Sequence, residues 1–256
     1  MPPLLTLLLL CGFAFLAGFL DSIVGGGGLV QLPALLVVMP EVAVTALLGT
    51  NKLSSIAGTS IAVVQYARRV EIPWGTMLPA AAMAFACSFL GALLATQVPA
   101  NILRPLILVL LIGVALYTFY KKDFGAIHAP KLSARWQLAS GLAVSGVIGF
   151  YDGFFGPGTG SFLIFALIGV LGFGFLTASA SAKVVNAATN LAAVILFAAT
   201  GNILYHIALP MALCNIAGSL LGSHVAIKQG AGFIRLFFLA VVLAIISKFA
   251  YDLWKP

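Results

Sequence analysis

Long apolar runs separated by short polar turns fill the chain from one end to the other. A helix needs about 20 apolar residues to cross a bilayer, whereas a barrel strand needs only about 10 that alternate with polar ones. The pattern therefore predicts membrane-spanning helices. The expected helical spans and shorter pieces are 3–22, 29–39, 42–67, 73–96, 102–120, 136–151, 162–171, 177–199, 204–226 and 232–252.

Two of these apolar runs are interrupted by glycines that follow an acidic residue. The first interruption is the stretch from Gly18 to Gly28, and the second is the stretch from Gly149 to Gly160. Each stretch begins with Gly-Phe, has an aspartate two residues later, and then breaks into glycines. An acid and a helix break are both costly inside a bilayer, so their presence predicts a functional site.

The two breaks belong to a duplication with a constant offset of 131 residues. Aspartate, lysine, arginine and proline are rare in this chain, so their recurrence at one offset is informative. The matched pairs include Asp21 with Asp152, Lys52 with Lys183, Pro79 with Pro210, Ser88 with Ser219 and Arg104 with Arg235. The sequence thus predicts two homologous halves, residues 1–121 and 136–256, joined by a basic loop at 122–135.

The length of the broken unit indicates how the halves are oriented. Residues 3–39 would extend about 55 Å as one helix, which is too long for a single crossing. A hairpin, re-entrant or fully spanning, returns to its own side, and the three spans after it give each half an odd number of crossings. The turn at 68–71 and the loop at 121–135 would then share one side with six basic residues, in line with the positive-inside rule. The expected fold is an all-α polytopic membrane protein of two inverted repeats, each with a glycine-broken helical hairpin plus three spans.

The composition excludes several classes of function. The chain is 62% hydrophobic and 7% charged, against about 25% charged residues in soluble domains. Most basic residues lie at segment ends, so the net charge of +7 indicates contact with membrane lipids and no nucleic-acid partner. The three cysteines and three histidines show no metal-ligand spacing, and no nucleophile–base arrangement is evident. We expect no enzyme activity and no cofactor or metal, while a homo-oligomer is compatible with the sequence.

Two lysines lie within predicted spans and begin equivalent polar stripes. Positions i, i+3 and i+7 share one face of a helix. The stripes are Lys52, Ser55 and Thr59, with Asn51 beside them, and Lys183, Asn186 and Asn190. A cation backed by hydrogen-bonding side chains on an inward face predicts an anion-binding set. The alternatives are that the lysines reach out to the interface, or that the amides and hydroxyls only join helices.

The glycine breaks supply a second candidate set of ligands. The first amides of a new helix have no partner within that helix, and with the helix dipole they favour an anion. The candidate residues are Gly26, Gly27, Gly28 and Gln31 in the first half, and Gly158, Thr159 and Gly160 in the second. The alternative is that the glycines only allow helices to cross closely.

Asp21 and Asp152 can be interpreted in three ways. They could form salt bridges to Lys52 or Lys183, cap the glycine turns, or act as protonatable coupling groups. Pairing or capping is the favoured interpretation.

The chain resembles the TauE/SafE sulfite exporter family, and in particular its YfcA-like branch. The resemblance rests on the run from Gly18 to Gly28, on Thr50-Asn51-Lys52, on the run from Gly149 to Ser161, and on the run from Ala182 to Asn190. It implies a transporter in the bacterial inner membrane for a small anionic substrate such as sulfite, a sulfonate or a related sulfur-containing anion. We expect export by alternating access, with rocking of the two halves. The alternatives are a cation- or proton-coupled pathway through Asp21 and Asp152, or uptake of an organic anion.

Overall fold

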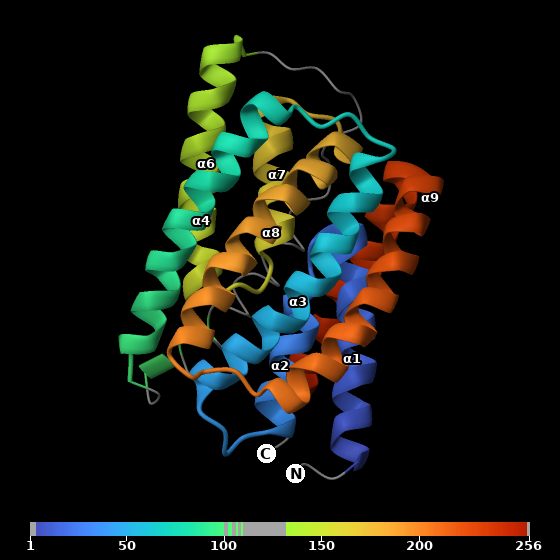
Figure 1. Ribbon diagram of the computed structural model, residues 1–256. Helices are drawn as coiled ribbons and strands as arrows, with labels where there is room; N and C mark the ends of the chain where they lie inside the picture. Colours follow the sequence, from blue (N-terminus) through green and yellow to red (C-terminus); the bar gives the residue numbers. More distant parts are fainter. Residues whose placement is uncertain (1–3, 100–101, 104–105, 107–108, 110–131, 255–256) are drawn as a thin grey trace.

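A computed structural model describes residues 4–99, 102–103, 106, 109 and 132–254 of the 256-residue chain. All regular structure in this part of the chain is helical, which confirms the predicted class (Figure 1). The helices are α1 (Leu4–Val24), α2 (Gly28–Val38), α3 (Val44–Ala67), α4 (Trp74–Gln97), α6 (Ala134–Phe154), α7 (Thr159–Leu171), α8 (Phe175–Ala199) and α9 (Tyr205–Trp254). Most of the predicted span 102–120, with Arg104, and the loop residues up to 131 lie outside the described residues.

Four segments in this part of the chain are long and apolar enough to cross a membrane. They are α1, α4, α8 and the first half of α9, Tyr205–Gln229. α2 and α7 have 11 and 13 residues, so each is about 16–20 Å long and reaches only part of the way across a bilayer. Each short helix forms a hairpin with the long helix before it, α1 with α2 and α6 with α7, as the glycine breaks predicted.

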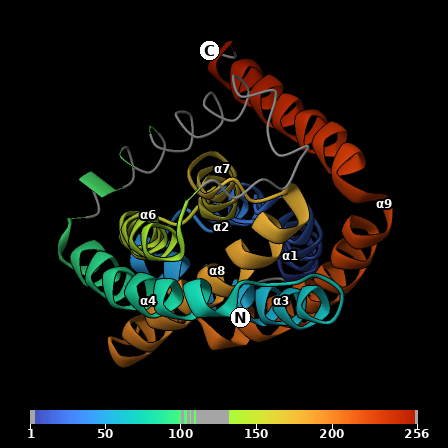
Figure 2. The same cartoon turned by 90° about the horizontal axis from the view of Figure 1, so that it is seen from above.

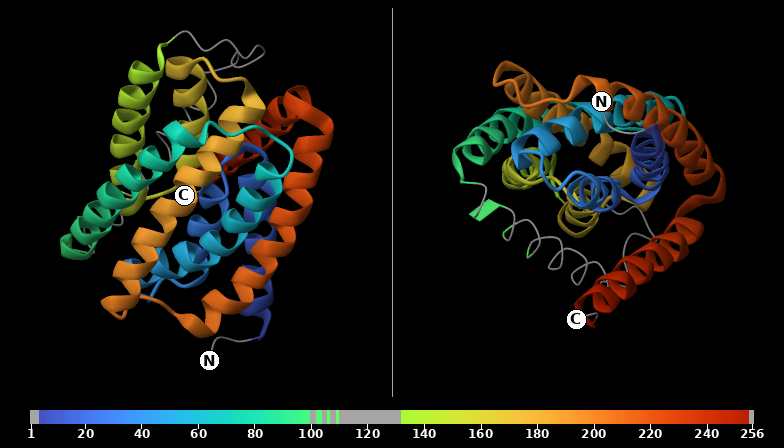
Figure 3. Two further views of the ribbon diagram at one scale, coloured as in Figure 1. Left: turned by 45° about the horizontal axis from the view of Figure 1, so that its top comes forward. Right: turned by 90° about the horizontal axis from the view of Figure 1, so that it is seen from below.

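The end of the chain differs from the sequence-based expectation. Two separate spans were predicted at 204–226 and 232–252, with a turn near Lys228, but α9 continues through this turn to Trp254. Fifty residues of helix would extend about 75 Å if straight, far more than one crossing. The helix instead changes direction sharply along its length (Figures 2 and 3).

Packing groups the described helices differently from the sequence halves. α1 and α3 pack with α9, α2 packs with α1 and α3, and we call these four helices the α1 bundle. α6 and α8 pack with α4, α7 packs with α6 and α8, and we call these four helices the α6 bundle. Each bundle therefore combines a hairpin and one long helix of one half with a helix of the other half. The two bundles meet mainly where α3 crosses α8, and equivalent helices such as α3 and α8 run in opposite directions (Figure 1).

Contacts between the halves recur at the 131-residue offset. The Ser88 hydroxyl donates to the Thr189 carbonyl at 2.9 Å, and the equivalent Ser219 hydroxyl donates to the Gly58 carbonyl at 2.6 Å. Close backbone approaches repeat in the same way, because a Cβ on Gly91 would overlap the Phe150 carbonyl, and one on Gly222 would overlap the equivalent Phe19 carbonyl. The duplication read from the sequence is thus matched by pairs of equivalent contacts in space.

Candidate functional site

The glycine breaks reverse the chain inside the molecule. α1 ends at Val24, and the chain turns through Gly25, which has φ of +75°. In the second half α6 ends at Phe154, and Gly156 and Gly158 have φ of +97° and +84° before α7 begins. Only glycine adopts this left-handed region without strain. The turns therefore need glycine at these particular positions.

The two hairpin tips touch each other at the interface between the bundles. The Ser161 amide donates to the Gly25 carbonyl at 3.2 Å, and the Ser161 hydroxyl donates to the Val24 carbonyl at 2.8 Å. A Cβ on Gly25 would overlap the backbone of Gly160. These contacts satisfy backbone carbonyls that the helix break would otherwise leave without a partner.

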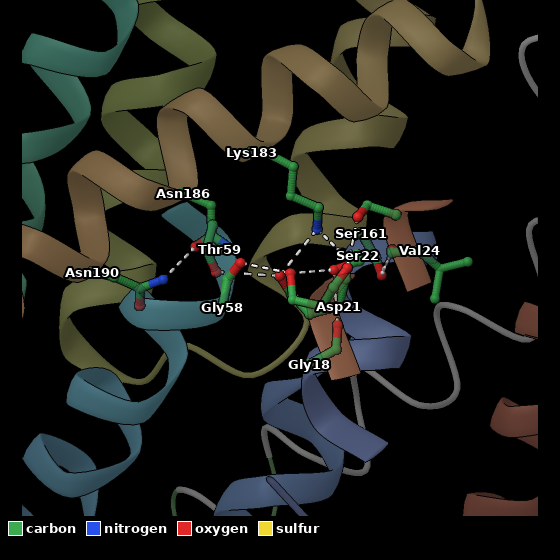
Figure 4. Close-up of polar contacts among 12 residues, drawn as sticks. Gly18, Asp21, Ser22, Val24, Gly58, Thr59, Ser161, Lys183, Asn186 and Asn190 are labelled. Atoms are coloured by element: carbon green, nitrogen blue, oxygen red, sulfur yellow. Dashed lines mark hydrogen bonds and ion pairs between the residues drawn. The ribbon is translucent and has the colours of Figure 1, made fainter. Parts of the chain in front are cut away.

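Two lysine–aspartate ion pairs connect the bundles beside these tips. Lys52 of α3 lies 2.7 Å from the Asp152 carboxylate of α6, and Lys183 of α8 lies 3.1 Å from the Asp21 carboxylate of α1. Lys183 also donates to the backbone carbonyl of Asp21 (Figure 4). The two ion pairs are equivalent in the duplication, because the offset of 131 residues relates Lys52 to Lys183 and Asp21 to Asp152. Of the three interpretations of the aspartates, the structure contains the salt bridges.

A small cavity lies between these groups. It is lined by residues of both bundles, namely Asp21, Gly25, Gly28, Asn51, Lys52, Ser55, Thr59, Asp152, Gly156, Gly158, Gly160, Asn186 and Asn190. Its volume is about 20 Å³, which is room for about one water molecule. The cavity in this structure is therefore too small for an oxyanion.

Most of the residues predicted from the two polar stripes and the glycine breaks line this cavity. Thr59, deep in α3, donates to the Asp21 carboxylate at 3.3 Å, and Asn190 of α8 bonds to Asn186 at 3.4 Å (Figure 4). Both stripes thus face the interface where α3 crosses α8. Lys52 is 2% exposed and Lys183 is fully buried, so neither lysine reaches out to the membrane interface in this structure.

Five predicted residues lie beside the cavity without lining it: Gly26, Gly27, Gln31, Thr159 and Lys183. Gln31 donates to the Asn51 carbonyl at 3.3 Å and accepts from the Asn215 side chain at 2.9 Å. Thr159 donates to the Gly156 carbonyl at 2.7 Å, which closes the second turn. These contacts hold the tips in shape.

Some residues of the site were not predicted from the sequence. Gly25 and Gly156 line the cavity at the positive-φ positions, although their neighbours were the ones proposed as ligands. Asn215, an isolated amide in an apolar run, fastens α9 to α2 through Gln31. Ser22 shares a 2.8 Å hydrogen bond with Ser219. A lone polar residue in an apolar run was the available signal for Asn215, whereas Ser219 was already known as the match of Ser88 in the duplication.

The cavity offers unused hydrogen-bonding capacity. The Asn51 side-chain oxygen is buried and has no hydrogen-bond partner among the described residues. In the same part of the chain, the amides of Gly28 and Gly160 donate to no backbone carbonyl, and both residues line the cavity. Buried polar groups without partners are costly, so a polar ligand at this position would be stabilised by them. The charges of the two lysines are meanwhile balanced by the two aspartates.

The site shows no arrangement for metal binding in the part of the chain that is described, where no group of three histidine, cysteine or acidic side chains converges. The fold and the site together have the features of a secondary transporter: duplicated halves, broken helices whose tips meet, and ionisable residues buried between two bundles.

Comparison with known proteins gives the family. The family model "Sulfite exporter TauE/SafE" matches residues 10–249. The chain therefore belongs to the TauE/SafE family and is a membrane transporter, embedded in the membrane.

Curated relatives match over most of their length. "Probable membrane transporter protein ORF9" of Sinorhizobium sp is 38% identical, with 95% of this chain and 92% of the relative covered. "Probable membrane transporter protein YfcA" of Escherichia coli K12 is 34% identical, with 93% and 87% covered. A "Probable membrane transporter protein" of Haemophilus influenzae is 35% identical, with 93% and 92% covered. No solved structure matches the chain significantly.

Proposed function

We propose that this protein exports a small anion, namely sulfite, a sulfonate or a related sulfur-containing anion, across the bacterial inner membrane, and that it is not an enzyme. The main support is the two buried lysine–aspartate pairs that join the bundles beside a polar cavity, which Lys52, Asp21 and Asp152 line. The family name supports sulfite as the first substrate to test.

In this structure the two aspartates act as counter-ions of the two lysines. Lys52 is held by one carboxylate, and the neutral groups around it are Asn51, Ser55 and Asn186. A buried cation must keep an opposite charge nearby, because an unpaired buried charge costs several kcal/mol. An entering anion can replace the Asp152 carboxylate, after which amides, hydroxyls and the free helix amides complete its binding.

Alternating access follows from the position of the ion pairs. Both pairs join the α1 bundle to the α6 bundle, so a movement that opens the cavity to either side must lengthen at least one of them. Rocking of the two sequence halves was expected, but each half contributes helices to both bundles. We therefore propose that the moving bodies are the α1 bundle and the α6 bundle, related to one another as inverted repeats.

The membrane potential sets the direction of movement. The cell interior is negative, and moving one charge through 100 mV is worth about 2.3 kcal/mol. A monovalent anion therefore leaves the cell downhill and a divalent anion gains twice as much. Export of such an anion needs no coupled ion.

Flux measurements in proteoliposomes test the proposal. We expect Lys52→Gln to lower sulfite efflux by about a hundredfold, because loss of a charged hydrogen bond costs roughly 1.5–3 kcal/mol and leaves Asp152 unpaired. Arg135→Gln is the control, since Arg135 is exposed at the start of α6. Sulfite efflux at the parent rate in both Lys52→Gln and Lys183→Gln would show that the lysines do not bind the substrate.

A coupled pathway is the second candidate. Asp21 retains 15% side-chain exposure and lines the cavity, which a proton- or cation-carrying carboxylate would require. Reversal potentials under opposed gradients separate the two candidates. Movement of a cation shifts the potential in the direction opposite to that of an anion, and uptake of an organic anion against the potential would require such coupling.

A further inference from the structure

A second cavity lies far from the lysine site, between the end of α3 and the middle of α9. It has a volume of about 710 Å³. Arg68 at its edge follows Lys52 by 16 residues along α3, which places it about 24 Å from the ion pairs. This distance is close to half of a membrane's full thickness, so with the ion pairs at the bilayer midplane the groove would lie at the level of the lipid headgroups.

Basic side chains form the rim of this groove. Arg68 and Arg69 come from the end of α3, and His224 and Lys228 come from one face of α9, four residues apart. All four are exposed. In the described part of the chain no carboxylate lies within 4.0 Å of Arg68, Arg69 or Lys228. Glu71, which lines a neighbouring cavity with Arg68 and Arg69, is the nearest acid along the chain, and the four basic side chains still leave the rim with a net positive charge.

The floor of the groove has the opposite character. Ile61 and Val64 of α3 face Leu220 and Ile227 of α9 across it. Val64 and Leu220 are 47% and 43% exposed, although both are large apolar side chains. A small hydrated anion gains nothing from such a floor. A phospholipid fits both parts, with its phosphate on the rim and its acyl chains along the floor.

We propose that this groove is a binding site for an anionic phospholipid. The positive-inside rule then places the end of α3 at the cytoplasmic face, where anionic headgroups and basic residues meet. Because the groove is formed by α3 and α9, a lipid seated in it joins two helices of the α1 bundle, and its loss is expected to loosen that bundle.

Thermal unfolding of the purified, delipidated protein tests the proposal. The three additives are phosphatidylglycerol, phosphatidylcholine with the same acyl chains, and glycerol phosphate. We expect phosphatidylglycerol alone to raise the melting temperature. Equal stabilisation by phosphatidylcholine would overturn the charge recognition, and equal stabilisation by glycerol phosphate would overturn the assignment to a lipid in favour of a free anion.

Substitutions of the basic rim residues test whether phosphatidylglycerol binds in this groove. Each basic residue near an anionic surface contributes about fivefold in affinity, so Arg68→Gln/Arg69→Gln/Lys228→Gln should weaken phosphatidylglycerol binding about a hundredfold. Lys228→Gln and Arg135→Gln form a matched pair of exposed single changes, and only the first should weaken binding. Leu220→Trp fills the floor without altering charge and should also reduce binding. Parent-like lipid affinity in both the triple variant and Leu220→Trp would overturn the proposal, whatever the sulfite flux of these proteins.

Discussion

The two lysine–aspartate pairs occupy equivalent positions in the duplication but have different surroundings. Lys52 meets the carboxylate of Asp152 and lines the cavity. Lys183 meets both the carboxylate and the backbone carbonyl of Asp21, is fully buried, and does not line the cavity. The duplication thus places two lysines in equivalent positions, but they differ in the number of their acceptors and in their access to the cavity. Lys52 is the one placed to exchange its carboxylate for a substrate, whereas Lys183 is tied to the tip of α1.

Removing one carboxylate should have the largest effect and should separate the pairs. We expect Asp152→Asn to destabilise the protein by about 3–5 kcal/mol, because it leaves Lys52 buried without an opposite charge. Asp21→Asn should cost less, since Lys183 keeps its backbone acceptor. The measurement is thermal unfolding in detergent, with and without sulfite.

Sulfite should restore stability to Asp152→Asn and not to Asp21→Asn, because only the first frees the lysine that lines the cavity. The chloride salt at equal ionic strength is the control. An equal response of both variants would remove the distinction between the two pairs and make the site symmetric.

Glycine substitutions at the first hairpin tip should have an intermediate effect. Gly25→Ala places a side chain at φ of +75° and against the Gly160 backbone, so we expect about 2–4 kcal/mol of destabilisation and loss of transport. Gly26→Ala is the matched control, because its Cβ would meet nothing closer than 3.8 Å. Thermal unfolding and sulfite flux measure both. Two equally damaged proteins would indicate that the tip tolerates no side chain at all.

The equivalent serines should show the smallest effects, with the larger loss at Ser219. Ser88→Ala and Ser219→Ala each remove a buried hydroxyl that donates to a carbonyl of the opposite half. Each should cost about 1 kcal/mol, which is the net value of a typical hydrogen bond. Ser219 also bonds to Ser22, so Ser219→Ala should be the more destabilising change, and equal losses would show that this additional hydrogen bond adds no stability. Thr96→Ala, at an exposed hydroxyl, is the control.

The helical class, the hairpins and the neighbourhood of the site could be predicted from the sequence. Periodicity placed Lys52, Ser55 and Thr59 on one face, and rare residues revealed the duplication, since both signals lie in the order of residues along the chain. The cavity indeed brings together Thr59 and Asn190, which are 131 residues apart in sequence.

Other features depended on packing that no local pattern records. The sequence suggested a turn near Lys228, yet α9 continues there, because the neighbouring Gly230 and Gly232 weaken a helix without ending it. Which lysine meets which aspartate was also open, since it is decided by how the hairpins cross. The packing of α9 against α1, and of α4 against α6, could not be predicted either. The duplication shows the order of the segments within each half, and it does not show which helices of the two halves pack together.

The exchange of helices between the halves has a consequence for biosynthesis. Asp21 enters the membrane early, but Lys183 is synthesised 162 residues later, and at 5–20 residues per second the delay is roughly 10–30 s. Lys52 is likewise synthesised before its partner Asp152. During that interval each unpaired charge sits in a nascent segment whose partner does not yet exist. The unpaired charges of the first half must therefore be kept out of the bilayer core until the second half has been synthesised and pairs with them. Either the insertion machinery holds these segments or they remain near the membrane interface.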